Sequence, residues 1–175
     1  MSETIYYGSK KLVGFGNVGI GTTTPVTALD VVGSIRQSSL PVLYVYKSTP
    51  DQTIAAATAI TFETTNYNTQ WTVTTTSRFT LTGPSGYYLI RARLASISTF
   101  VYLSASIRVN GTERAGPYNN CPGGANISTT YTEVVWLLNT NDYIEVFGVP
   151  SVSLIIQSAS DARTAFQAVY LSGTT

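Results

Sequence analysis

The chain has 175 residues, of which 43% are apolar and 11% are charged, and its net charge is +1. An average soluble domain carries about 25% charged residues, so this surface depends on uncharged polar side chains. The apolar fraction is too high for a disordered chain, and the near-zero net charge provides no attraction to nucleic acid. We expect no membrane insertion and no signal peptide. No apolar run approaches about 18–20 residues, and the polar first residues lack an apolar core of about 7–15.

Missing residue types exclude most catalytic and metal sites. The chain has no histidine and one cysteine, Cys121. Ser-His-Asp triads, Cys-His pairs and histidine-based zinc sites are therefore excluded, as is an internal disulfide. We expect no cofactor, no metal and no enzymatic activity.

Residues 1–38 are rich in Gly and Thr and form the first predicted segment. Their short apolar bursts have the length of minimal strands, at Ile5–Tyr7, Lys11–Val13, Val18–Ile20 and Leu29–Val32. Fewer than about 40 residues cannot hold a core alone without metal or disulfide. This segment is therefore disordered, docks on another surface, or pairs its strand edges with other copies of the chain. The apolar bursts make disorder the weakest of the three interpretations.

Residues 39–175 read as β-strands throughout, because they are rich in Val, Ile, Tyr, Phe and Thr and lack a sustained helical period. The predicted strands are Pro41–Lys47, Ala59–Phe62, Gln70–Thr74, Arg78–Thr82, Tyr87–Ile97, Val101–Asn110, Ser128–Leu138, Tyr143–Val149 and Thr164–Leu171. About nine or ten strands with turn residues between them predict an all-β jelly-roll sandwich.

Some of these strands are apolar on both faces. The strand at Tyr87 alternates between apolar and polar residues, but Pro41–Tyr46, Thr130–Leu138 and Thr164–Leu171 do not. A two-sheet sandwich buries only the inner face of each sheet, and no helix is left to cover the other face. Another subunit is the economical cover, and each large side chain so buried would contribute about 1.5–3 kcal/mol. The candidate interface residues are Tyr44, Tyr46, Trp136 and Tyr170.

The first segment contains the string GNVGIGTTTP, at 16–25, followed by LDVVGSI, at 29–35. This pattern resembles an element of phage tail fibres and related fibre proteins, where it lies in slender trimeric stalks before a terminal head. The resemblance implies architecture and identifies no ligand. A Gly-rich linker is the plain alternative. A phosphate-binding loop is disfavoured, because no Gly-Lys-Ser/Thr follows and no helix opens there.

The second segment resembles the complement-component-one-q-like globular heads, a branch of the tumour-necrosis-factor-like jelly rolls. The matching positions are Phe62, Asn66 or Asn68, Trp71, Arg78–Thr80, Pro84, Gly86, Tyr88, Ile90, Val109–Gly111, Asn141–Ile144 and Phe166–Leu171. Members of this family are trimers, and some bind calcium at the trimer apex. Here the loops offer only Asp51, Glu113 and Asp161 as carboxylates, too few for the six to eight oxygens that calcium takes.

In a jelly roll, successive connections alternate between the two ends of the sandwich. We therefore expect Ser48–Thr58, Gly83–Gly86, Gly111–Ile127 and Pro150–Arg163 at the end away from the first segment. Loops longer than about 12–15 residues are often functional. In Gly111–Ile127 the candidate ligand-binding residues are Glu113, Arg114, Tyr118, Asn119 and Asn120, since Tyr and Asn give contact area and adaptable hydrogen bonds. Packing against a neighbouring subunit is the alternative.

These features favour a non-enzymatic homotrimeric virion protein, such as a short fibre, spike or capsid decoration. Residues 1–38 would bind other virion structural proteins, and the head would attach to a host receptor or glycan. The protein would assemble in the host cytoplasm and reside in the virion. The alternatives are a purely architectural minor capsid or baseplate protein, and a cellular adhesin or lectin-like module. A glycan-cleaving enzyme needs two carboxylates about 5–10 Å apart, but Glu133 and Glu145 are expected in opposite sheets.

Overall fold

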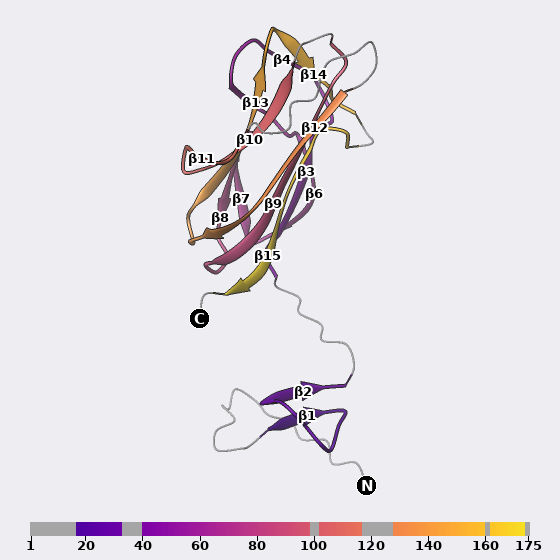
Figure 1. The fold of residues 1–175 in the computed structure, drawn as a ribbon, viewed down its shortest axis with the longest axis vertical. Coiled ribbons are helices and arrows are strands. Elements are labelled where there is room, and N and C mark those ends of the chain that lie inside the picture. Colours follow the sequence, from indigo (N-terminus) through magenta and orange to yellow (C-terminus); the bar gives the residue numbers. More distant parts are fainter. Residues whose placement is uncertain (1–16, 33–39, 99–101, 117–127, 160–161, 174–175) are drawn as a thin grey trace. The chain divides into compact units, whose positions relative to one another are not determined.

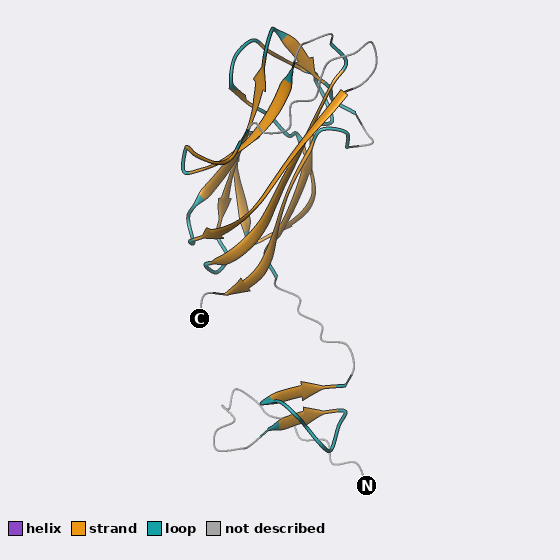
Figure 2. Cartoon of the chain, viewed as in Figure 1, coloured by secondary structure: helices purple, strands orange, loops and turns teal. Residues whose placement is uncertain are grey.

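The chain divides into two compact units, Met1–Ser38 and Ser39–Thr175, and we call the second unit the head. The structure, a computed structural model, describes residues 17–32, 40–98, 102–116, 128–159 and 162–173. These residues form strands, turns and loops and no helix (Figure 2). Among them, accordingly, no helix is long and apolar enough to cross a membrane. The apolar bursts predicted at Ile5–Tyr7 and Lys11–Val13 lie outside the described residues.

The first unit contains two short parallel strands, β1 (Val18–Ile20) and β2 (Leu29–Val31) (Figure 1). The chain between them turns at Gly21, which has a φ of 75°. A Cβ atom at that position would lie 2.7 Å from the carbonyl oxygen of Val32, so both the backbone angle and the space require glycine. The bursts predicted at Val18–Ile20 and Leu29–Val32 are therefore confirmed as strands.

The described part of the first unit leaves its apolar side chains in solvent. Ile20, Leu29 and Val32 are 56%, 57% and 66% exposed, and Val26 is 83% exposed. Parallel strands in proteins are almost always covered on both faces. This pair therefore needs a cover that its own described residues do not supply.

Two sheets form the head. The six-stranded sheet has the order β11 (Thr112–Ala115), β10 (Leu103–Val109), β13 (Tyr143–Pro150), β8 (Arg78–Leu81) and β7 (Trp71–Thr75), and β5 (Thr58–Ala59) also pairs with β13. The seven-stranded sheet has the order β4 (Gln52–Ile54), β14 (Leu154–Ile156), β9 (Gly86–Ser96), β15 (Ala165–Gly173), β3 (Val42–Tyr46) and β6 (Thr64–Thr69), with β12 (Ser128–Leu138) on the free side of β9. From β8 onwards the long strands alternate between the two sheets, as the predicted jelly roll requires.

The core lies between the sheets. Every second residue of β9 is fully buried, at Tyr88, Ile90, Ala92 and Leu94, and the residues between them point outwards. Three phenylalanines from different parts of the chain meet at ring-centroid distances of 5.3–6.1 Å, at Phe62, Phe79 and Phe166. The alternation predicted for the strand at Tyr87 is therefore confirmed.

Four of the observed head strands, β4, β6, β11 and β14, were not predicted from the sequence. β6 reads Thr-Thr-Asn-Tyr-Asn-Thr and is mostly exposed, so it has no apolar face to reveal it. It forms by hydrogen bonding along β3, with Tyr44 opposite Tyr67. Of the predicted strand Ala59–Phe62, only Ala59 lies in a strand, β5, while Ile60 and Phe62 are buried in the core.

The loops between strands lie at the two ends of the head. We call these the Pro41 end and the Lys47 end, after the residues that flank β3. At the Lys47 end, β4 pairs with β14, so Ser48–Thr58 and the described part of Pro150–Arg163 lie together, as predicted. The placement of Gly83–Gly86 at that end is wrong. Gly86 pairs with Leu138 and Gly173, and a Cβ atom on Gly83 would lie 2.9 Å from Pro41 Cγ. The connection therefore lies at the Pro41 end.

Candidate functional site

The outward face of the seven-stranded sheet carries the three strands that were predicted to be apolar on both faces, β3, β12 and β15. The antiparallel register aligns the outward side chains of these strands with those of β9 in rows across the sheet. Two rows toward the Pro41 end are mostly apolar and contain Leu137 and Tyr87, then Val135, Leu89, Val169 and Val42. We call them the apolar rows.

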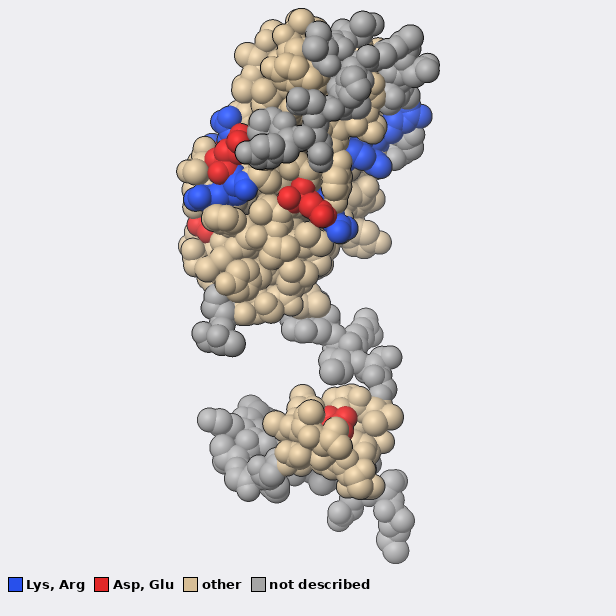
Figure 3. Space-filling view, in the orientation of Figure 1, with Lys and Arg blue, Asp and Glu red and all other residues tan. Residues whose placement is uncertain are grey.

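The apolar rows are open to solvent in the single chain. Val135 is 53% exposed, Tyr87 44% and Leu137 36%, and the neighbouring Leu171 is 51% exposed. Figure 3 shows that charged side chains gather in a band across the middle of the head in that view, with uncharged surface toward the end where β15 finishes. Neighbouring apolar side chains exposed in this way are typical of contact surfaces.

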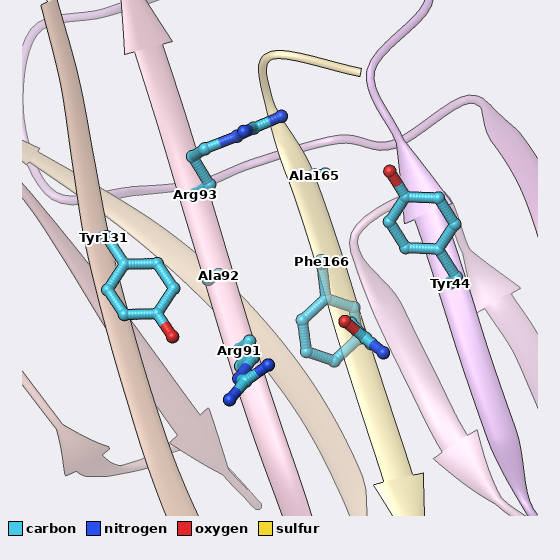
Figure 4. A pocket seen from close by; sticks show the side chains of 8 residues that line it. Tyr44, Arg91, Ala92, Arg93, Tyr131, Ala165 and Phe166 are labelled. Atoms are coloured by element: carbon cyan, nitrogen blue, oxygen red, sulfur yellow. The ribbon is translucent and has the colours of Figure 1, made fainter. Parts of the chain in front are cut away.

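The next two rows, toward the Lys47 end, are polar and aromatic. One contains Glu133, Arg91, Gln167, Tyr44 and Tyr67, and the other contains Tyr131, Arg93, Ala165 and Tyr46. A pocket of about 280 Å³ opens between them, lined by Tyr44, Arg91, Arg93, Tyr131 and Gln167, and its floor is formed by Ala92, Ala165 and Phe166. In Figure 4, Tyr131 and Tyr44 stand on either side of the two arginines. We call this the arginine pocket.

Glu133 accepts hydrogen bonds from two residues that line the arginine pocket. Its Oε2 accepts a hydrogen bond from Arg91 Nε at 2.9 Å and another from the Tyr131 hydroxyl. These two donors, Tyr131 first, hold the pKa of Glu133 below its ordinary value, and the same contact raises the pKa of Tyr131. Glu133 therefore stays ionised at mildly acidic pH, and it keeps the Arg91 guanidinium in a fixed orientation.

Arg93 is held on the other side by the turn that precedes β15. Its Nε donates to the carbonyl oxygen of Arg163 at 2.9 Å, and its Nη2 donates to that of Ala162. Ala162 has a φ of 56°, a left-handed conformation that a non-glycine residue rarely adopts. Arg93 thus fixes this turn while its charge remains at the pocket.

The structure divides the four predicted interface residues between the two faces of the sheet. Tyr44 and Tyr46 lie on the outward face, in the polar rows. Trp136 and Tyr170 both lie opposite Tyr88, which is fully buried, and they pack against the core instead. The one-residue alternation of a strand turns these two side chains inward. The outward side chains beside them, which were not singled out from the sequence, are Val135, Leu137 and Val169.

The structure describes only two of the five predicted ligand-binding residues, Glu113 and Arg114. Glu113 and Arg114 belong to β11 at the edge of the six-stranded sheet, not to a loop at the Lys47 end. Glu113 Oε2 accepts a hydrogen bond from Ser106 at 2.6 Å, and the Arg114 guanidinium lies 4.6 Å from the centre of the Trp136 ring. Tyr118, Asn119 and Asn120 lie outside the described residues.

A second hollow, of about 610 Å³, lies where β11 and β12 approach each other, and it joins Glu113 and Arg114 to Tyr131 and Glu133. Tyr131 thus borders both hollows, since β12 is the edge strand between them. Among the described residues, no group of three or more His, Cys, Asp or Glu side chains could hold a metal ion. Glu133 and Glu145 lie in opposite sheets, as predicted, so they form no carboxylate pair for glycoside hydrolysis.

Neither the family models nor the curated proteins contain a match to this chain. Solved structures do match it. Eiger TNF from S. frugiperda superposes with a TM-score of 0.63 at 8% identity, over 78% of this chain and 96% of that one. Murine APRIL at pH 8.5 superposes with a TM-score of 0.56 at 14% identity, over 76% of this chain and 100% of that one. The head has a tumour-necrosis-factor-like jelly-roll fold. Identities this low establish the fold alone, so the function must be argued from the surface.

Proposed function

We propose that the protein is a non-enzymatic binding module that works as a homotrimer, with the outward face of the seven-stranded sheet turned toward the other copies. The observation that carries this proposal is the exposure of the apolar rows on a sheet whose inner face is already packed. A second copy is the natural cover, because the apolar rows are continuous and the chain supplies no helix among its described residues. Trimers are also what the resemblance to complement-component-one-q-like heads implies.

The sheet edges support assembly through this face. β12 runs for eleven residues along β9, and it brings Val135 and Leu137 to the outward side. Burying each of these side chains against another copy would contribute about 1.5–3 kcal/mol. A closed ring of three copies would cover the face on every protomer and leave no apolar patch to drive further association.

The biological role that we propose is attachment. The fibre-type element in residues 16–35 supports a place in a virion, as a short fibre, spike or capsid decoration that binds other virion proteins through residues 1–38. The head would then contact a host receptor or glycan. A purely architectural role in the particle is the alternative within the same proposal.

Trimer formation is tested by placing a charge in the apolar rows. Val135→Glu should dissociate the assembly at micromolar concentration, because three carboxylates would be forced into one interface. The matched control is Val73→Glu on β7, since Val73 is also an exposed edge-strand valine, at 39% exposure, but lies in the other sheet. Sedimentation equilibrium should give three chains for the unsubstituted protein and for the control, and one chain for Val135→Glu. A monomeric unsubstituted protein, or equal effects of both substitutions, would contradict the proposal.

Attachment is tested separately, by binding of the labelled full chain to host cells and to an array of glycans. Binding that saturates and that requires the trimer supports the attachment role. A stable trimer that binds neither surface would favour the architectural role.

A further inference from the structure

The arginine pocket carries positive charge on the face that the proposed trimer turns toward its other copies. Its described lining contains two arginines, Arg91 and Arg93, and no carboxylate. Glu133, which lies opposite Arg91 on β12, pairs with that arginine at 2.9 Å. Arg93 has no carboxylate partner among the described residues, since its hydrogen bonds go to the carbonyl oxygens of Arg163 and Ala162. The described part of this face therefore carries one positive charge in excess.

Assembly makes this excess charge costly. A guanidinium group that is taken out of water needs an anionic partner, because nothing else replaces its lost hydration. Every Asp and Glu side chain that the structure describes already accepts a hydrogen bond from its own chain. Examples are Glu113 and Glu145, which accept from Ser106 and Arg78. An anion from solution is therefore favoured over a carboxylate of the neighbouring copy.

The donors that remain in the pocket fit an oxyanion. Arg91 uses its Nε for Glu133, so its two Nη groups have no hydrogen-bond partner among the described residues. These two groups can donate side by side to two oxygens of one anion. The Tyr44 hydroxyl and the Gln167 amide also have no partner within the described ranges, and Arg93 adds a second positive charge (Figure 4). A tetrahedral oxyanion offers enough acceptors for all of these donors.

We propose that the trimer encloses a small multivalent oxyanion of the phosphate class in each arginine pocket, held by Arg91, Arg93, Tyr44 and Gln167. The anion neutralises the excess charge that the contact between copies would otherwise bury. This inference rests on the trimer proposed above. An anion that the neighbouring copy covers binds the trimer more tightly than the single chain, so it stabilises the trimer by linkage.

The test compares the association of the unsubstituted full chain in millimolar phosphate and in sodium chloride of matched ionic strength. Matched ionic strength gives both solutions the same general screening of charge. In phosphate, the concentration at which the copies dissociate should fall at least tenfold, measured by sedimentation equilibrium. Sulfate has the same tetrahedral geometry and should act as phosphate does, whereas acetate should not. Equal dissociation concentrations in phosphate and chloride would overturn the proposal.

Equilibrium dialysis with labelled phosphate gives a second measurement, which does not require the copies to dissociate. We expect one bound phosphate per chain in the trimer. A trimer that binds no phosphate would overturn the proposal. Phosphate that binds equally tightly to the trimer and to the diluted single chain would show that the neighbouring copy does not enclose the pocket, and this too would overturn it.

Two matched variants locate the site. Arg91→Gln should abolish both the bound phosphate and the effect of phosphate on association, whereas Arg78→Gln should leave both unchanged. Both arginines are partly exposed and pair with a glutamate, at 2.9 and 3.0 Å, but Arg78 lies in the six-stranded sheet. Tyr44→Phe should weaken phosphate binding by a smaller factor, because it removes one donor. Equal losses in Arg91→Gln and Arg78→Gln would overturn the assignment.

Arg91→Gln should still form the trimer in chloride, because the substitution also removes the excess charge. Loss of the trimer in both solutions would mean that Arg91 itself contacts the next copy, and this would overturn the enclosed anion.

The outcomes separate this inference from the proposed function. A trimer that is indifferent to phosphate would overturn the enclosed anion and leave the trimer standing, with a group of the neighbouring copy as the partner of the arginines. An unsubstituted protein that stays a single chain in both solutions would contradict the trimer itself.

Discussion

Glu133 shows how two neighbours can fix the charge of a residue that is itself nearly half exposed. Its side chain is 46% exposed, so burial has little influence, and the hydrogen bonds from Tyr131 and Arg91 lower its pKa. We expect a nuclear magnetic resonance titration of the Glu133 carboxyl carbon to give a midpoint below 4.5, the ordinary value for this group. Because the folded-state pKa is depressed, the contact is fully present above the ordinary pKa and is lost as pH falls through the lower one. In Tyr131→Phe the midpoint should rise toward 4.5, and an unchanged midpoint would contradict the assigned cause.

Lys47 is the most deeply buried charged side chain among the described residues, at 1% exposure. Its ammonium group donates to Glu63 Oε1 and to Thr61 Oγ1, both at 2.9 Å. Lys47→Met would keep the packing of the stem but leave these acceptors without their partner. We expect a loss of about 1–3 kcal/mol in the free energy of unfolding, measured by chemical denaturation.

Arg91→Met is the matched control for Lys47→Met. Arg91 also pairs with a glutamate, Glu133, at 2.9 Å, but both side chains are nearly half exposed, at 45% and 46%. Solvent-exposed pairs contribute little to stability, so the control should change the unfolding free energy by less than the Lys47 substitution. Equal effects would mean that burial does not set the strength of the Lys47 contact.

Among the strands, apolar content and length together decided which ones could be predicted from the sequence. Strands β3, β9, β10, β12, β13 and β15 carry alternating or continuous apolar residues and were predicted close to their observed positions. The polar edge strand β6 was missed, because its stability comes from hydrogen bonds to β3 rather than from burial. The arginine pocket was missed for a related reason. Arg91, Tyr131 and Gln167 are far apart in sequence, and only the strand register aligns them.

The start of β9 depends on a glycine. Gly86 lies beside the irregularity in the pairing of β9 with β15, and a Cβ atom there would come within 2.4 Å of the backbone oxygen of Ser172. Backbone cannot give way as a flexible side chain can, so Gly86→Ala should destabilise the head by about 1–3 kcal/mol. In the control Gly173→Ala the nearest atom is the Tyr170 hydroxyl at 3.1 Å, which can move. Thermal unfolding compares the two, and equal melting temperatures would contradict this explanation.

The two units of the molecule differ in how far they bury their own apolar side chains. The head has its own core of buried residues, whereas the described part of the first unit exposes its apolar side chains. Two contacts on one chain reinforce each other, since formation of one raises the effective concentration for the other. The first unit should therefore strengthen association between copies even though the head carries the larger apolar face.

The test substitutes Ile20 and Leu29 together by Asp in the full chain. If these apolar side chains are buried between copies, each substitution would remove about 1.5–3 kcal/mol of association free energy. A change of about 1.4 kcal/mol corresponds to a tenfold change in affinity. We expect the concentration at which the copies dissociate to rise at least tenfold, measured by sedimentation equilibrium, while the melting of the head measured at high concentration stays the same. Thr23 and Thr24, exposed residues of the turn between β1 and β2, provide the control when both are replaced by Asp, because the added charge is identical. If the control dissociates the copies as strongly as the double apolar substitution, repulsion between charges explains the effect and the first unit makes no apolar contact between copies.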